Sequence, residues 1–305
     1  MAHDVHAERA ALLALLKIRP GKSTWPELAT EVAFLGSAIC LLEERTSQSL
    51  LPDPEVVAAL ESAEADLAEW DRMGLRLVTV MDSDYPRRLL DIRETPPFLF
   101  ASGHLLSDDR GMSVVGSRHA SPLGLSMAAT AAELLVEKGL TVIAGLAAGI
   151  DSAAHRAALA AGGRTVAFIG TGIRKSYPAE NRALQREIEE RGLVLSQFLP
   201  DAPPTKYNFP MRNATMSGYG HATIVVEAGE TSGTRIQARL ATQHGRPVIL
   251  ARAVAEKTQW GAALAERRGV YVVAGTGELQ SAIEQVLGEQ EALRAALRDL
   301  APSAA

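Results

Sequence analysis

An apolar run that ends near residue 115 is followed by three residues suited to phosphate binding: Gly116, Ser117 and Arg118. A glycine at the carboxyl end of a strand lets main-chain amides approach a phosphate, and a following helix adds the positive end of its dipole. Such a helix is predicted to begin near Pro122, with Ser121 as its N-cap. Arg118 would then supply a charged fork, although a tight turn with a solvated arginine explains the motif equally well.

The next apolar run leads into a second glycine turn, which contains Gly145 and Gly149. Both glycines would permit the close approach of a ligand, and Asp151 could cap the following helix or orient a bound group. His155 lies on the same alanine-rich helix. For a histidine in such surroundings, a packed side chain is favoured over a catalytic base.

A third turn places two adjacent cations after its glycines, in the sequence F-I-G-T-G-I-R-K-S-Y-P. Gly170 and Gly172 would open the turn, and Arg174 and Lys175 would hold a nucleic-acid backbone. A solvated basic loop is the alternative interpretation.

The segment K-Y-N-F-P-M-R-N at residues 206–213 interleaves aromatic residues with cations and has no clear periodicity. Bases stack on aromatic faces for about 1–3 kcal/mol each while cations follow the backbone, so this composition is typical of a single-strand site. Tyr207 and Phe209 could equally belong to the core. The residues assigned to the site are Lys206, Phe209, Arg212 and Asn213.

The last candidate turn, in V-V-E-A-G-E-T-S-G-T-R, would present hydroxyls and amides at another helix N-terminus. Its candidate phosphate-binding residues are Ser232, Gly233 and Thr234. All five candidate segments follow apolar runs, and the carboxyl ends of parallel strands meet at one edge of a sheet. We therefore expect the five segments to gather at that edge, where such folds bind ligands.

The elements that must position these turns alternate between apolar runs and helical segments. After Asp109 the runs are SVVG, TVIAG, TVAFIG, LVLSQF, ATIVVEA, PVILA and VYVVAG. Near-continuous apolar strands alternating with helices indicate a parallel sheet covered on both faces. The predicted fold class is α/β, an extended Rossmann-like doubly wound, mainly parallel sheet with a small helical N-terminal domain and a C-terminal helix.

The predicted domain organisation has four parts. Leucine and alanine spacing indicates helices from Glu8 to Met73. The stretch that follows contains a short β-like run and proline-rich extended chain, and the final APSAA is expected to fray. The boundaries are 1–74 for the helical domain, 75–108 for the extended lead-in, 109–276 for the Rossmann-like domain and 277–305 for the C-terminal helix and tail.

Composition excludes several classes of function. Charged residues make up 22% of the 305 residues and the formal net charge is −5, so a nucleic-acid site must be a local patch. Cys40 is expected to be a buried thiol, because it lies in an apolar run, in a reducing compartment. There is no membrane-spanning run, no metal-ligand cluster and no nucleophile elbow, so we expect a cytoplasmic protein with no metal and no catalytic residues.

The motifs together resemble the DNA-processing protein A family (DprA, also called Smf). The blocks VVGSRHASPLG, AGLAAGIDSAAHRAAL, GRTVAFIGTGIRKSYPAEN, FPMRN and VVEAGETSGTRIQARLATQHGRPV follow the family's signature in order, and the resemblance runs from Leu75 to Leu250. The chain departs from the family at Ala214, where an arginine is usual, and in ARAVAEKTQWGAALAERRG after Leu250. No C-terminal winged-helix domain is expected.

The resemblance implies an extended Rossmann domain that binds single-stranded DNA without hydrolysing it and that uses no cofactor. It implies a homodimer that helps to load a RecA-type recombinase during natural transformation or recombination, as in competence and DNA uptake. By matching positions, Arg118 would contact DNA phosphates, the glycine turns would line the groove, and residues 209–213 would approach backbone and bases. A specialised role in defence against foreign DNA stays open.

Three other classes of function compete. A phosphoribohydrolase of the related superfamily would need a glutamate where this chain has Gln237, and an amide cannot act as the acid or base. A protein that binds a mononucleotide without catalysis survives as the second hypothesis. An NAD-dependent enzyme is disfavoured, since the first turn lacks G-x-G-x-x-G spacing and TVIAG offers no acidic ribose ligand. A purely structural adaptor is disfavoured by the number of glycine turns.

Overall fold

Two compact units make up the chain, and the chain passes between them more than once. The first contains Met1–Asp109 and Ala167–Tyr219, and the second contains Arg110–Val166 and Gly220–Ala305. The computed structural model describes residues 4–46 and 53–300 of these units, so the predicted frayed end APSAA lies outside the described residues. The sequence-based boundaries at 74, 108 and 276 stay predictions.

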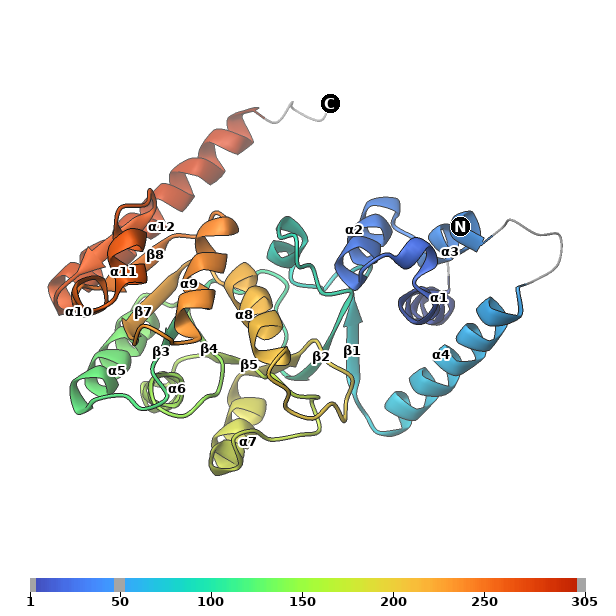
Figure 1. Ribbon diagram of the computed structural model, residues 1–305, viewed down its shortest axis with the longest axis horizontal. Helices are drawn as coiled ribbons and strands as arrows, with labels where there is room; N and C mark the ends of the chain where they lie inside the picture. Colours follow the sequence, from blue (N-terminus) through green and yellow to red (C-terminus); the bar gives the residue numbers. More distant parts are fainter. Residues whose placement is uncertain (1–3, 47–52, 301–305) are drawn as a thin grey trace. The chain divides into compact units, whose positions relative to one another are not determined.

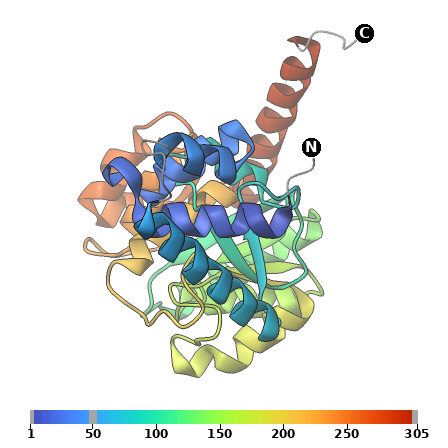
Figure 2. The same ribbon diagram turned by 90° about the vertical axis from the view of Figure 1, so that its right-hand side faces the viewer.

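The predicted N-terminal helices are present in the first unit, and local signals mark their ends. They are α1 (Val5–Ile18), α2 (Trp25–Leu35), α3 (Ala38–Thr46) and α4 (Pro54–Arg72). Thr24 and Glu27 form a capping box that starts α2. Gly36, at φ 72°, ends α2 in the left-handed conformation that glycine adopts without strain. The apolar stretch from residue 27 to residue 44 therefore forms two helices, α2 and α3. Figure 2 shows α1 lying across α4, and the two helices are in contact.

A buried carboxylate from α1 caps the start of α3. Glu8, on α1 and 7% exposed, accepts hydrogen bonds from the Ser37 hydroxyl (2.7 Å) and from the Ala38 amide (2.6 Å). A negative charge is stabilised at the positive end of a helix, and here it satisfies main-chain amides that the helix leaves unpaired. α1 and α3 are thereby fixed to each other.

Cys40 is exposed, so the prediction of a buried thiol was wrong. The buried residues of α3 are Ala38, Leu41 and Leu42, which follow helical spacing. By this spacing, Cys40 falls on the opposite side of the short helix. The apolar run that suggested burial is interrupted at Gly36, so it does not form one continuous buried face.

The strands of the first unit are stabilised by aromatic packing. They are β1 (Arg76–Thr79), β2 (Phe98–Gly103), β6 (Leu193–Ser196) and the end of β5 (Thr165–Phe168). β2 pairs antiparallel with both β1 and β6. Its Phe100 contacts Trp70 of α4 at 5.0 Å between ring centroids, and its Phe98 contacts Trp25 of α2 at 5.6 Å. These contacts between aromatic rings join the N-terminal helices to the sheet.

The other helical segments of the first unit are η2 (Arg87–Asp91), η3 (Ala179–Asn181), α7 (Arg182–Arg191) and α8 (Asn208–Tyr219). α8 begins within the segment in which the sequence showed no periodicity. Pro210 is the third residue of this helix, a position in the first turn where proline costs no hydrogen bond.

The pairs β3–β4, β3–β7, β7–β8 and β8–β9 of the second unit are parallel, which gives the order β4-β3-β7-β8-β9. Figure 1 labels the first four of these strands. The bounds are β3 (Gly111–Gly116), β4 (Thr141–Ala144), β7 (Thr223–Glu227), β8 (Val248–Ala251) and β9 (Val270–Val273). Together with the antiparallel pairs of the first unit, they confirm a mixed α/β fold with mostly parallel strands.

Helices cover both faces of these parallel strands. They are α5 (Pro122–Glu137), α6 (Ile150–Ala160), α9 (Thr234–Gln243), α10 (Arg252–Lys257), α11 (Gln259–Ala265) and α12 (Thr276–Leu300). Ile224 and Val226 of β7 belong to one core with residues of α5, α6 and α12. Val225 between them is fully buried and points to the opposite face, and α9 contacts β7 and β8. Burial on both faces explains the continuous apolar runs.

None of the helices in the described ranges 4–46 and 53–300 is by itself long and apolar enough to cross a bilayer. α2 and α3 reach the required length and composition only as a pair bent by 114°.

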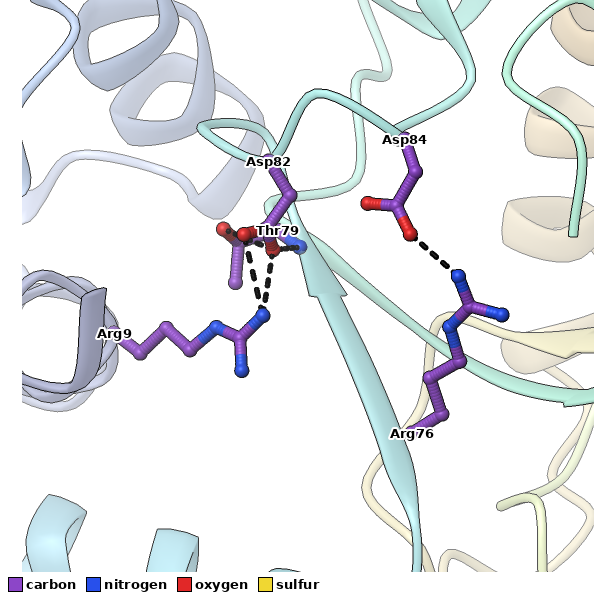
Figure 3. A network of polar contacts seen from close by, with 5 residues as sticks. All are labelled: Arg9, Arg76, Thr79, Asp82 and Asp84. Carbon is purple, nitrogen blue, oxygen red and sulfur yellow. Dashed lines mark hydrogen bonds and ion pairs between the residues drawn. The ribbon is translucent and has the colours of Figure 1, made fainter.

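Two ion pairs near β1 differ in burial (Figure 3). Arg9 of α1 donates to both oxygens of Asp82, at 3.2 and 3.1 Å, and the two side chains are 29% and 16% exposed. Asp82 also accepts from the amide and hydroxyl of Thr79. Arg76 and Asp84 form a pair at 2.5 Å whose side chains are 46% and 41% exposed. The Asp82 network therefore ties α1 to β1, whereas the Asp84 pair lies in solvent.

We expect Asp82→Asn to lower the free energy of unfolding by about 1–3 kcal/mol, because an amide cannot keep every charged hydrogen bond of that network. Asp84→Asn is the matched control and should cost less than about 1 kcal/mol, since exposed pairs contribute little. Urea denaturation followed by circular dichroism measures both. Equal losses in the two variants would contradict the structural role of Asp82.

Candidate nucleic-acid interface

The turn after β3 is built as the sequence predicted, with one unforeseen partner. α5 begins at Pro122, and Ser121 caps it by accepting a hydrogen bond from the Gly124 amide at 3.0 Å. Glu227, at the end of β7, accepts from the amide of Ser121 at 3.0 Å and from its hydroxyl. A carboxylate therefore already occupies the N-terminus of α5, and Arg118, which is exposed, becomes the principal candidate for phosphate contact in this turn.

The glycines of the first two turns are required by contact between the turns themselves. A Cβ on Gly116 would lie 2.5 Å from the Ile150 side chain, and one on Gly149 would lie 2.3 Å from the Ser117 carbonyl oxygen. Gly149 also has φ 79°, which disfavours other residues. The Ile150 amide donates to the Ser117 carbonyl at 3.2 Å. These glycines hold two neighbouring turns together, and their contact with phosphate stays a prediction.

Asp151 stabilises the turn after β4 rather than capping α6. Its carboxylate is 6% exposed and accepts from the Gly145 amide at 3.0 Å and from the Ala147 amide at 3.4 Å. His155 is fully buried, and its Nδ1 lies 2.6 Å from the Thr165 hydroxyl oxygen. The prediction of a packed histidine is confirmed. Sequence reasoning missed both anchoring roles. Glu227 acts on a residue 106 positions away, and Asp151 accepts from the turn that precedes it instead of capping its own helix.

In the first unit, the turn after β5 packs against α8 and a neighbouring loop. A Cβ on Gly170 would lie 2.8 Å from the Phe209 ring, and one on Gly172 would lie 2.2 Å from the Pro200 carbonyl oxygen. The Phe209 ring also lies 5.7 Å from that of Tyr177, which is 42% exposed. Phe209 is thus half-buried between the glycine turn and an exposed aromatic ring.

Among the predicted cations of the first unit, two lysines are exposed and one arginine is buried. Lys175 is exposed, and it shares Asp201 with Arg174, at 3.4 and 2.8 Å. Lys206 is also exposed, and its ammonium lies 5.1 Å from the centroid of the Tyr207 ring, which is 69% exposed. Both lysines are therefore accessible to a backbone phosphate.

Arg212 is the buried cation, with only 6% of the residue exposed. Its guanidinium donates to the Phe168 carbonyl at 2.6 Å and so joins α8 to the end of β5. Asn213 beside it is half-buried. Ala214 is 3% exposed, so this departure from the family pattern lies on the packed side of α8. Contact of Arg212 and Asn213 with DNA stays a prediction.

The turn before α9 is less closely packed than the other glycine turns described above. Gly233 is exposed, has φ −59°, and a Cβ there would meet nothing within 4 Å. The Ser232 hydroxyl accepts from the Thr234 amide at 3.2 Å and donates to the Thr234 hydroxyl at 3.0 Å. The turn is therefore ordered by its own side chains.

No group of three or more His, Cys, Asp or Glu side chains that could hold a metal ion occurs in residues 4–46 and 53–300.

Comparison with known proteins identifies the family pattern. The model of the DNA recombination-mediator protein A family matches residues 76–283. The chain is 38% identical over 190 residues to Protein Smf of Synechocystis sp., covering 60% of this chain and 47% of that protein. It is 41% identical over 172 residues to the DNA processing protein DprA of Streptococcus pneumoniae, covering 56% of this chain and 61% of that protein. The chain thus spans roughly half to three fifths of these relatives.

Solved structures agree with the fold. The crystal structure of DNA processing protein A from Streptococcus pneumoniae superposes with a TM-score of 0.66 at 29% identity, covering 87% of this chain and 96% of that one. DNA processing protein A from Helicobacter pylori superposes with a TM-score of 0.61 at 22% identity, covering 69% and 96%. The second likeness is one of fold alone.

We expect Gly149→Ala to lower the free energy of unfolding by at least about 2 kcal/mol, because a Cβ meets a carbonyl oxygen in a strained backbone conformation. Gly233→Ala is the control and should change stability by less than about 1 kcal/mol, since its backbone conformation and surroundings admit a methyl group. Thermal unfolding measures both. Tolerance of alanine at position 149 would disprove the close packing of the two turns.

Proposed function

The chain belongs to the DNA recombination-mediator protein A family, and on this premise we propose that it binds single-stranded DNA without hydrolysing it. Its action would lie in DNA processing during natural transformation or recombination. We also propose that it forms a homodimer and helps to load a RecA-type recombinase onto the bound strand. A protein of the same fold from Helicobacter pylori has a described single-stranded DNA binding mode.

The observation that carries the proposal is the cluster of aromatic rings and exposed cations at the start of α8. Tyr207 and Tyr177 are 69% and 42% exposed, and Lys206 lies against the Tyr207 ring. Accessible rings stack unpaired bases and adjacent cations follow phosphates, whereas the bases of a duplex are not available for stacking. The combination favours a single strand over a duplex.

The interface also limits how DNA would be held. Glu227 and Asp151 are carboxylates that already accept hydrogen bonds from turn amides of the second unit. A phosphate would be repelled from those amides, so affinity would depend on side-chain cations such as Arg118. The net charge of −5 acts in the same direction.

A non-enzymatic role is supported by Gln237. This residue stands where the related phosphoribohydrolases have a glutamate, and it is 1% exposed on α9. An amide neither donates nor accepts a proton at neutral pH as a general acid or base must. We propose that any bound nucleotide is held without cleavage of its glycosidic bond.

A second candidate function, binding of a mononucleotide, is favoured by a cavity of 580 Å³ beside the turn after β5. Four cations line it: Arg174, Lys175, Arg182 and Arg186. The Thr171 hydroxyl and the Gln185 side-chain carbonyl also line it, and within the described residues these buried atoms have no hydrogen-bond partner. Buried polar atoms usually have partners, and a nucleotide offers both phosphate and hydrogen-bond donors.

We expect Arg118→Ala to weaken binding of a labelled single-stranded oligonucleotide by tenfold or more, about 1.4 kcal/mol, since a charged phosphate contact is lost. Binding should weaken with salt, and the slope of log K against log salt should fall by about 0.7 in the variant. Fluorescence anisotropy measures both quantities. Arg156→Ala, an exposed arginine on α6, is the control of equal charge and should bind as the unmodified protein does.

Unlabelled single strands, duplexes and mononucleotides serve as competitors in the same titrations. Displacement by excess single strand alone supports the proposal. Failure to bind any oligonucleotide, or displacement by a mononucleotide at low concentration, would instead favour the second candidate.

A further inference from the structure

A groove of 190 Å³ lies between α9 and α11 in the second unit. Its lining residues are Arg235, Arg239, Trp260, Ala263, Leu264 and Arg267. Arg235 and Arg239 lie one turn apart on α9, and α11 and the residues after it supply the other wall. At about 30 Å³ for each water molecule in the liquid, the groove has room for about six waters. It is large enough for a flat ring.

The arginines of this groove carry charge that the chain does not neutralise. Within the described part of the chain, residues 4–46 and 53–300, none of the three forms an ion pair with a carboxylate. Arg239 donates to the neutral Gln243 amide, with 3.3 Å between Nη1 and Oε1. The nearby Glu230 carboxylate accepts from the Gln259 amide at 2.8 Å, which fixes the start of α11. An anion is therefore the complementary occupant.

The floor of the groove is apolar and includes an aromatic ring. Trp260 is half-buried, and its indole NH donates to the Gly229 carbonyl at 3.2 Å, which fixes the orientation of the ring. Leu264 beside it is 6% exposed, and Ala263 adds little bulk. A fixed indole flanked by guanidinium groups offers a stacking surface together with phosphate contacts. A simple inorganic anion would leave the stacking surface unused.

The groove begins at the residue that directly follows the open turn before α9. Arg235 directly follows Ser232, Gly233 and Thr234 in the chain and lies in the first turn of the helix. A strand whose phosphate contacts that turn would next meet Arg235. The opposite wall belongs to ARAVAEKTQWGAALAERRG, the segment in which the sequence departs from the family pattern.

We propose that the α9–α11 groove binds one nucleotide of the single strand, with its base against Trp260 and its flanking phosphates against Arg239 and Arg267. The inference rests on the proposed function. It extends the contact surface beyond the glycine turns, with one wall, Trp260 to Arg267, in the segment that departs from the family pattern.

The double variant Arg239→Ala/Arg267→Ala tests the groove through anisotropy titrations of a single-stranded oligonucleotide at several salt concentrations. We expect about tenfold weaker binding and a salt slope smaller by about 1.4, which corresponds to two lost phosphate contacts. The control is Arg156→Ala/Arg268→Ala, which removes two exposed arginines, one of them adjacent to Arg267 but outside the groove lining. It should retain the affinity and the slope of the unmodified protein.

A second readout locates the base. An oligonucleotide with 5-iodouracil is irradiated in the complex, and the adduct is sought on the tryptic peptide of residues 258–267, which contains Trp260. The adduct is expected in the unmodified protein. It should be lost from the corresponding peptide of the double variant, residues 258–268, because trypsin no longer cleaves after position 267.

The proposal for the groove would be overturned if the unmodified protein binds and the double variant has the same affinity as its control. The proposed function would then still stand. The proposal would also be overturned if the double variant gave the same yield of the adduct on the peptide that contains Trp260. Absence of single-strand binding by the unmodified protein would remove both proposals.

Discussion

Parallel pairing of strands that are buried on both faces is the constraint on which the rest of the second unit depends. Every residue of β4 and β8 is buried, so their main-chain groups must pair within the sheet. Parallel pairing places the carboxyl ends of β4, β3 and β7 at one edge. The turns after these strands therefore lie near one another, and their side chains can act on one ligand.

The same packing determines which groups remain for that ligand. Gly116 and Gly149 are used where one turn contacts another, and two carboxylates, Glu227 and Asp151, hold turn amides. The amides of Ser121, Gly145 and Ala147, which these carboxylates hold, are not available to a phosphate. Binding would depend on a small number of cations and aromatic rings, so each such side chain would have a large effect on affinity. The α9–α11 groove would add both kinds of group.

The fold was predictable where the local sequence reflects burial. The hydrogen-bond partners of individual side chains were not predictable from the sequence. Seven apolar runs matched strands, and in all of them except β9 nearly every residue is buried, which leaves little room for polar residues. Ser121 marked the start of α5 through a local capping bond. Glu8 caps a helix 30 residues away, a long-range contact invisible to local spacing. The burial of Arg212 was also hidden, since the first turn of α8 contains Pro210 and mixed residues that conceal its helical period.

Amide hydrogen exchange, with and without a saturating single-stranded oligonucleotide, tests the central claim most directly, because it reports every turn in one experiment. The account predicts slower exchange in residues 116–121, 170–177, 206–213 and 231–239, and unchanged exchange in α4. Protection confined to residues 171–189 and produced equally by a mononucleotide would contradict it, as would an oligonucleotide that protects none of these turns.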